Sequence, residues 1–245
     1  MTQHTDQWGG RAILLLIAGL PITMILAATW LWYFVERGDI DIVGALGTAR
    51  ALSDLGHEVT VISGPPYPEI RKDIKLVKIP SLDLFSKKNK FLDVKFSKLF
   101  SLNNLKEWIS ANSGGFPEPH TFGPRLEKFI EENAGQFDVI HDNQTLCKEL
   151  ISLQQKLPLV TTIHHPITKD LEFQLKSTND FFLKLLIKRW HSFIPTQIKV
   201  AKKLKKIVVP SESSGKDVVQ DFSLKDESIE VVHNGIDLGF FYPSD

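Results

Sequence analysis

Apolar residues along this chain follow two patterns, one near its start and one over the remainder. Residues 12–35 hold no charged side chain in 24 positions, and about 20 apolar residues are enough for a helix to cross a bilayer. Trp8 precedes this run and Trp30, Trp32 and Tyr33 close it, as is typical of aromatic anchors at a membrane interface. The pattern predicts a transmembrane helix, with a cleaved signal peptide or a buried core helix as the alternatives.

Beyond residue 36, short apolar runs alternate with segments of helical periodicity. The runs rich in β-branched residues predict strands at residues 57–63, 74–79, 137–141, 159–164, 206–210 and 229–233. The periodic segments predict helices at residues 49–55, 124–133, 146–155, 181–203 and 215–222. Short buried strands separated by helices are typical of βαβ units. We therefore predict an α/β fold in which a Rossmann-like parallel sheet is flanked by helices.

These patterns also predict the domain organisation. Residues 1–37 form an N-terminal tail and the transmembrane helix, and residues 38–245 form one Rossmann-like domain. Gly56 follows the first predicted helix, as expected of a C-cap. Residues 82–120 have the least regular pattern and predict a long excursion or mobile loop, of a kind that often carries function.

Charge and cysteine content exclude several classes of function. Lys and Arg total 29, as do Asp and Glu, so the chain lacks the basic excess of a dedicated nucleic-acid binder. Cys147 is the single cysteine of the sequence, which excludes a disulfide framework and a cysteine-based metal site and indicates a reducing compartment. His164 and His165 are adjacent on a predicted strand, where neighbouring side chains diverge, so no metal site is predicted.

One segment is strongly basic. Residues 184–206 contain seven Lys, one Arg and no acidic residue, interleaved with large apolar residues. Helical spacing makes this an amphipathic basic surface that suits contact with anionic lipid. The alternative is a solvated helix face whose apolar side packs in the core.

Polar residues gather after four of the predicted strands. In an open parallel sheet, ligands bind beyond the carboxyl ends of the strands, so together these residues predict a site for a polar, hydroxyl-rich ligand. Each has a structural alternative when taken singly, such as an N-cap for a serine or a turn for Asn-Gly. The candidates are His141, Asn143, His164, Ser211, Glu212, Asn234 and Gly235, with Lys169 a few residues beyond the fourth strand.

Five stretches carry a family resemblance. In order and spacing they resemble the N-terminal, acceptor-side domain of the GT-B, family-4-type retaining glycosyltransferases, here fused to an unrelated membrane segment. The resemblance covers roughly residues 45–243. The stretches are ALGTARALSDLGHEVTVISGPP from residue 45, FDVIHDNQ from 137, LPLVTTIHHP from 157, KKIVVPSESSGKDVV from 205 and IEVVHNGIDLGFFYP from 229.

The resemblance implies transfer of a sugar from a nucleotide-diphosphate donor to a hydroxyl acceptor, with no further cofactor. By position, His164 is the catalytic-cleft histidine, Lys169 holds a phosphate, and His141 and Asn143 contact the acceptor. Ser211 and Glu212 form a cleft-facing loop. Asn234 and Gly235 belong to the stretch that leads to the donor-binding domain in this family, which the 245 residues do not include, so the chain is expected to be inactive alone.

The start of the domain departs from the family, which opens with a strand and a glycine-rich loop. We expect that strand to be missing, which would leave the sheet with a gap or an exposed edge. The alternative is a strand at residues 39–43 followed by a loop containing Gly44 and Gly47.

Other functions stay open on the sequence. The chain is alternatively a non-catalytic, membrane-tethered module that binds an acceptor or a separate donor-binding domain, a fragment of a GT-B nucleotide-sugar epimerase, or a rearranged frame. The expected partners are membrane lipid and a sugar or lipid-linked acceptor. We expect a single-pass membrane location with the domain on the cytoplasmic side, where nucleotide sugars are available.

Overall fold

The computed structural model describes residues 40–89 and 91–235. The predicted transmembrane helix at residues 12–35 lies outside this part of the chain. Within it, no helix combines the length and the apolar character that crossing a membrane requires. The chain divides into two compact units, Met1–Val43 and Gly44–Asp245.

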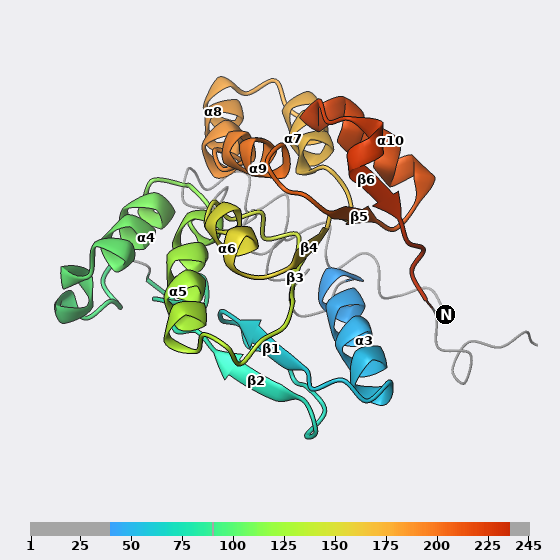
Figure 1. The fold of residues 1–245 in the computed structure, drawn as a ribbon. Coiled ribbons are helices and arrows are strands. Elements are labelled where there is room, and N and C mark those ends of the chain that lie inside the picture. Colours follow the sequence, from blue (N-terminus) through green and yellow to red (C-terminus); the bar gives the residue numbers. More distant parts are fainter. Residues whose placement is uncertain (1–39, 90, 236–245) are drawn as a thin grey trace, which may run out of the picture. The chain divides into compact units, whose positions relative to one another are not determined.

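Helices and strands alternate along most of the second unit (Figure 1). The strands are β1 (Thr60–Ser63), β2 (Lys75–Lys78), β3 (Ile140–Asn143), β4 (Leu159–Thr162), β5 (Ile207–Val209) and β6 (Ile229–Val231). The α-helices are α3 (Ile40–Asp54), α4 (Leu102–Asn112), α5 (Glu118–Glu132), α6 (Leu150–Lys156), α7 (Ile167–Lys176), α8 (Phe181–Trp190), α9 (Ile194–Ala201) and α10 (Glu212–Phe222). Two short 3-10 helices are η1 (Phe96–Phe100) and η2 (Asp226–Ser228).

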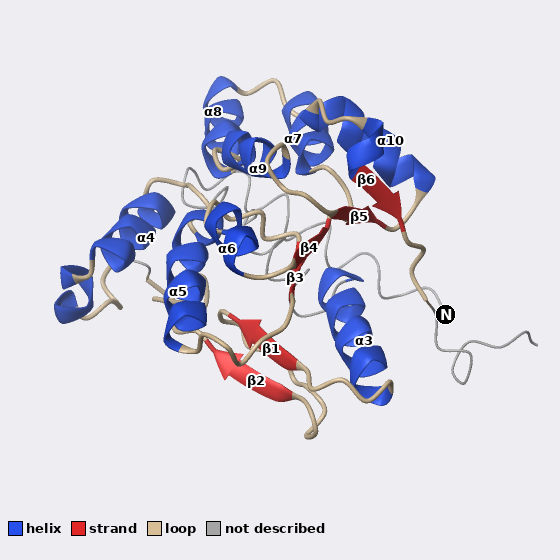
Figure 2. Cartoon of the chain, viewed as in Figure 1, coloured by secondary structure: helices blue, strands red, loops and turns tan. Residues whose placement is uncertain are grey.

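All strand pairs within the described residues are parallel, as predicted (Figure 2). They form two separate sheets, a pair in the order β1-β2 and a four-stranded sheet in the order β3-β4-β5-β6. Ile140 is level with Leu159, and Ile207 with Ile229, so the carboxyl ends of the four strands share one edge.

The sheets and helices share one hydrophobic core. Residues from α5, α6, α9 and α10 pack with the strands, and the side chains at its centre are 0–2% exposed. Parallel strands covered on both faces need apolar residues at successive positions, which explains the short β-branched runs of the sequence. The central members include Leu150, Leu153, Ile163, Ile207, Val209, Val218 and Phe222.

The alternative of a strand at residues 39–43 is wrong, because α3 begins at Ile40 and continues to Asp54. The β-branched residues at its start are followed, past Gly44 and Gly47, by Ala, Leu and Arg, which are strong helix formers, and helix formation is cooperative. Just beyond its end lies Gly56, the predicted C-cap glycine, whose φ is 91°. There the Gly56 N–H donates to Ser53 O and the His57 N–H to Leu52 O.

Residues 82–120 are more ordered than predicted. They contain η1, α4 and the first turn of α5. Leu82, Leu84 and Ala111 form a second, smaller core against which Val94, Leu99 and Trp108 pack. The apolar residues of this segment pack on this separate small core and not on a sheet, so they show no regular period in the sequence.

The single helix predicted at residues 181–203 is two helices, α8 and α9, broken at residues 191–193. Pro195 lies in the first turn of α9, where its missing N–H is harmless, whereas inside a continuous helix it would clash with the preceding turn. The apolar side of this segment is packed around α9 and exposed at the start of α8. Phe193 and Ile194 are buried, whereas Phe181, Phe182 and Leu185 are exposed. The Trp190 ring stacks on Phe116 at 5.2 Å.

Candidate functional site

The carboxyl ends of β3 and β4 bring Asn143 and His164 together. His164 Nε2 lies 2.9 Å from Asn143 Oδ1, and both side chains are half-buried. The two strands pair with Asn143 level with Thr162, so a residue just past the end of β4 faces the end of β3. The predicted association of these two candidates is therefore present in the structure.

Gln144 holds the backbone of the neighbouring strand in place. Its side-chain oxygen accepts from the His164 N–H at 2.6 Å, and its Nε2 donates to His165 O at 2.8 Å. Its φ is 58°, a conformation that non-glycine residues seldom adopt and that often marks functional sites. Sequence reasoning missed Gln144, because nothing in a glutamine after a strand signals this double contact.

Asp142 stabilises the turn that follows β3. The carboxylate is 5% exposed and accepts hydrogen bonds from the Thr145 hydroxyl, from the Thr145 N–H at 3.2 Å and from the Leu146 N–H at 3.4 Å. Burial raises the pKa of the Asp142 carboxyl, although these donors oppose the shift. The Asp142 carboxylate thus fixes the turn that carries Asn143 and Gln144.

His141 lies on the same face of β3 as Asn143, since residues two apart in a strand share a face. Its Nε2 is 2.8 Å from Thr162 Oγ1. Partial desolvation and, secondly, the nearby His164 lower the pKa of His141, which favours its neutral imidazole. His165 instead contacts Asp170, with Nε2 3.1 Å from Oδ2, and diverges from His164 as predicted.

The start of α10 joins the same edge. The Ser211 hydroxyl accepts from the Ser214 N–H at 3.1 Å, which is the N-cap role considered for it. The Ser214 hydroxyl donates to His164 O at 2.8 Å and so ties α10 to the end of β4. Glu212 is exposed in the first turn of α10. Ser214 is a further residue that sequence reasoning missed.

Three other predicted residues are placed differently. Asn234 and Gly235 are exposed beyond β6. Lys169 Nζ lies 3.3 Å from Asp221 Oδ1 and 3.8 Å from Asp217 Oδ1, and its hydrogen bond with Asp221 raises the pKa of its ammonium. The charge of Lys169 is thus paired with two acids of α10.

Neither a cluster of metal-ligating side chains nor an accessible thiol is found in the part of the chain that the structure describes. It contains no group of three or more His, Cys, Asp or Glu side chains arranged to hold a metal ion. Cys147 is fully buried, and burial raises the pKa of its thiol to about 12. A protonated, inaccessible thiol is inert as a nucleophile.

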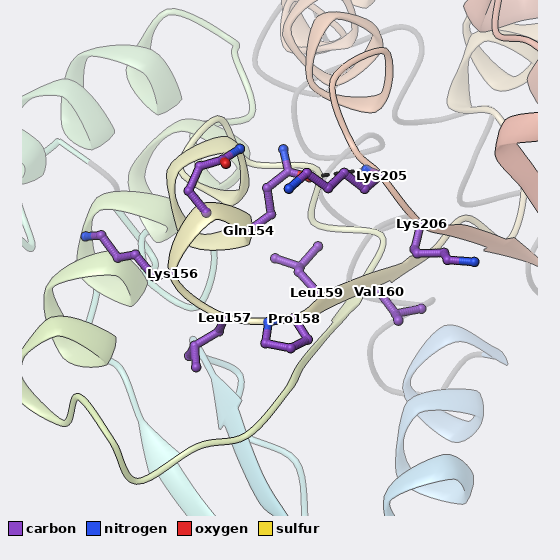
Figure 3. Close-up of a pocket in the computed structure, with 9 residues that line it drawn as sticks. Gln154, Lys156, Leu157, Pro158, Leu159, Val160, Lys205 and Lys206 are labelled. Atoms are coloured by element: carbon purple, nitrogen blue, oxygen red, sulfur yellow. Dashed lines mark hydrogen bonds between the residues drawn. The ribbon is translucent and has the colours of Figure 1, made fainter.

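A cavity of ≈ 400 Å³ lies at the other end of the sheet (Figure 3). Its lining includes residues at the amino ends of β4 and β5, whereas His164 follows the carboxyl end of β4. The Lys205 N–H donates to Gln154 Oε1 at 3.2 Å across its wall. The cavity is therefore separate from the candidate site. Its lining residues are Gln154, Gln155, Lys156, Leu157, Pro158, Leu159, Val160, Lys205 and Lys206.

Comparison with known proteins bears on the whole domain. Residues 43–240 match the model of the family described as Glycosyltransferase Family 4. Over 197 residues the chain is 37% identical to the MMP α-(1→4)-mannosyltransferase of Mycolicibacterium hassiacum, an alignment that covers 80% of this chain and 48% of that protein. The chain thus spans about half the length of this curated relative.

Proposed function

This chain belongs to glycosyltransferase family 4, and we propose that it is the acceptor-side domain of a retaining mannosyltransferase. The reaction moves a mannosyl residue from a nucleotide-diphosphate donor to a hydroxyl of an acceptor sugar. The observation that carries this proposal is the convergence of Asn143, His164 and the start of α10 at one edge of the sheet. The similarity to an α-(1→4)-mannosyltransferase supports mannose as the sugar.

His164 is proposed to orient a sugar hydroxyl. When its Nε2–H donates to Asn143 Oδ1, Nδ1 carries the lone pair and accepts a hydrogen bond from the substrate. Gln144 and Ser214 fix the backbone of His164 from two sides. Such fixed placement lowers the barrier mainly by positioning the reacting groups. Transfer additionally requires a donor-binding domain, in the same polypeptide or in a separate one.

Acceptor binding tests the proposal on this chain. We expect an α-(1→4)-linked mannooligosaccharide to bind the purified chain, as measured by isothermal titration calorimetry. His164→Ala is expected to weaken binding about tenfold, since it removes a hydrogen bond to the ligand. His165→Ala is the matched control, because His165 is exposed and contacts Asp170. Absence of binding, or equal binding by both variants, would refute the proposed role.

We also propose that residues 12–35 anchor the protein in a membrane with the domain on the cytoplasmic side. The uncharged run and its aromatic ends support this. Membranes from expressing cells should retain the protein after alkaline carbonate extraction, and protease added to inside-out vesicles should digest the domain. Release by carbonate, or protection in such vesicles, would contradict the proposal.

A further inference from the structure

Six of the exposed large apolar side chains lie within one short segment, and a smaller group lies on α7 and α8 at Phe173, Phe181, Phe182 and Leu185. Residues 82–112, called the excursion below, comprise the loop after β2, η1 and α4. An isolated exposed leucine is ordinary, whereas a cluster of exposed large apolar residues marks an interaction surface. The exposed fractions are 59% for Phe91, 73% for Leu92, 76% for Phe96, 79% for Phe100, 76% for Leu102 and 52% for Ile109.

These side chains point outward from an ordered backbone. The excursion folds around its own small core, described above. The Asn89 side chain accepts hydrogen bonds from the N–H groups of Phe91 and Leu92, both at 3.0 Å. Asn104 Nδ2 donates to Lys98 O at 2.9 Å. These hydrogen bonds therefore fix the backbone that carries the exposed residues.

The same segment is basic. Between residues 87 and 109 the sequence has six Lys against one Asp and one Glu, although the whole chain is neutral. Asp93 accepts from the Asn89 N–H at 2.9 Å, and Glu107 is buried against Arg125. The exposed charge beside the apolar side chains is thus mostly positive. Among the described residues it comes from Lys88, Lys95, Lys98 and Lys106.

We propose that the excursion docks on the surface of an anionic lipid bilayer. Apolar side chains can enter the boundary between headgroups and acyl chains while lysines contact anionic headgroups, and each lysine adds to the attraction. Protein–protein interfaces, in contrast, are depleted in lysine. A neutral glycan offers no negative charge for the lysines to meet. Charge complementarity therefore selects anionic lipid as the occupant. This inference does not depend on the proposed acceptor.

A fluorescent probe on the excursion tests the contact locally. Ser97 is exposed and lies between Phe96 and Phe100, so Ser97→Cys provides a thiol for bimane while Cys147 stays buried. Vesicles of phosphatidylcholine with added phosphatidylglycerol are expected to shift the emission to the blue, and spin-labelled lipid to quench it. Phosphatidylcholine alone should leave the emission unchanged. Because the probe reports its own surroundings, the apolar run at residues 12–35 does not produce this signal.

Matched variants complete the test. The same probe introduced by Gln220→Cys on α10, far from α4 in Figure 1, should not respond to vesicles. Adding Phe96→Ser and Phe100→Ser, or Lys95→Glu and Lys98→Glu, should weaken the lipid response at least tenfold, since each pair removes apolar area or charge attraction. The changed side chains are exposed, so circular dichroism should be unaltered.

Three results would overturn the proposal. An emission that does not change with anionic vesicles would show that the surface does not meet lipid. A blue shift with soluble mannooligosaccharide in place of lipid would assign the surface to a glycan. A shift that depends on protein concentration without lipid would assign it to a second copy of the chain.

Discussion

Gly123 lies where helix α5 passes close to the turn after β3. A Cβ at this position would overlap the Glu149 carboxylate and lie 2.9 Å from Cys147 Cβ. Both neighbours are buried, so neither can move at low cost. We predict that Gly123→Ala lowers the free energy of unfolding by about 1–3 kcal/mol, as overpacking typically does, in urea denaturation monitored by circular dichroism.

Gly47→Ala is the matched control for this change. Gly47 lies inside α3, and a Cβ there would meet nothing within 4 Å. Alanine is the better helix former, so this substitution should raise the free energy of unfolding by roughly 0.5–1 kcal/mol. If Gly123→Ala were as favourable as Gly47→Ala, the close approach of α5 and Glu149 would be wrong.

His191 makes stability depend on pH. It is 5% exposed, and its Nδ1 lies 2.9 Å from Ile187 O. Burial lowers its pKa below 6.5, although the hydrogen bond and Asp170 oppose the shift. The unfolded chain therefore binds a proton at His191 more readily than the folded chain. The stability that the neutral imidazole contributes is complete above pH 6.5 and is lost as the pH falls toward the folded-state pKa.

His191→Asn isolates this contribution, because asparagine can still donate to Ile187 O. Over the window below pH 6.5, the wild type should lose up to about 1.4 kcal/mol per pH unit more than the variant. Urea denaturation at a series of pH values measures the difference. Parallel pH profiles for the two proteins would show that His191 does not titrate in this way. Asp142 and Glu149 titrate in the same way in the wild type and the variant, so they do not contribute to the difference between the two pH profiles.

Single residues also show what the sequence could reveal of the site. Asn143 and His164 were predictable because both follow strands, and a parallel sheet brings such positions to one edge. Gln144 and Ser214 could not be predicted. The contacts of Gln144 depend on its positive φ, and that of Ser214 on a hydrogen bond to a residue 50 positions away. Lys169 looked like a free cation, but two acids one helical turn apart on α10 compensate it.

At the scale of elements, the strands were predicted well and the helix ends less so. Each predicted strand overlaps an observed one, because buried parallel strands need continuous β-branched runs. The start of α5 was misplaced, because Pro124 suggested a first turn but lies inside the helix. The break before α9 was signalled by Pro195 and overlooked. The ordering of η1 and α4 depends on contacts within the excursion, which periodicity does not reveal.

Helix α10 depends on its N-cap. The Ser211 hydroxyl accepts from the Ser214 N–H, and replacing an N-cap serine by alanine typically costs about 1 kcal/mol. We predict this loss for Ser211→Ala in urea denaturation. Ser213→Ala is the control: Ser213 is exposed in the first turn of α10, and surface substitutions usually stay within about 0.5 kcal/mol. Equal losses would mean that Ser211 does not cap the helix.

At the scale of the whole domain, the excursion is joined to the main core through a buried ion pair. Arg125 Nη2 on α5 lies 2.5 Å from Glu107 Oε2 on α4, with side chains 16% and 1% exposed. Glu107 Oε1 accepts from the Leu82 N–H at 2.8 Å, and Arg125 also donates to Asn104 Oδ1 at 2.8 Å. One charge pair thus connects α5, α4 and the strand exit after β2.

Arg125→Met should loosen α4 from α5, while the contact of Phe85 with Trp190 and the hydrogen bond from Arg189 to Ser110 remain. Removing one partner leaves a buried charge uncompensated, which typically costs about 3–5 kcal/mol. The main core does not contain Glu107, so we expect a local opening: amides of α4 should exchange with solvent at least about 100-fold faster by native-state hydrogen exchange. Amides of β4 and β5 should be nearly unchanged. Glu107→Gln added to Arg125→Met removes the buried charge and should restore part of the protection. If β4 and α4 lost protection equally, the excursion and the core would unfold as one unit, and the pair would stabilise the whole domain.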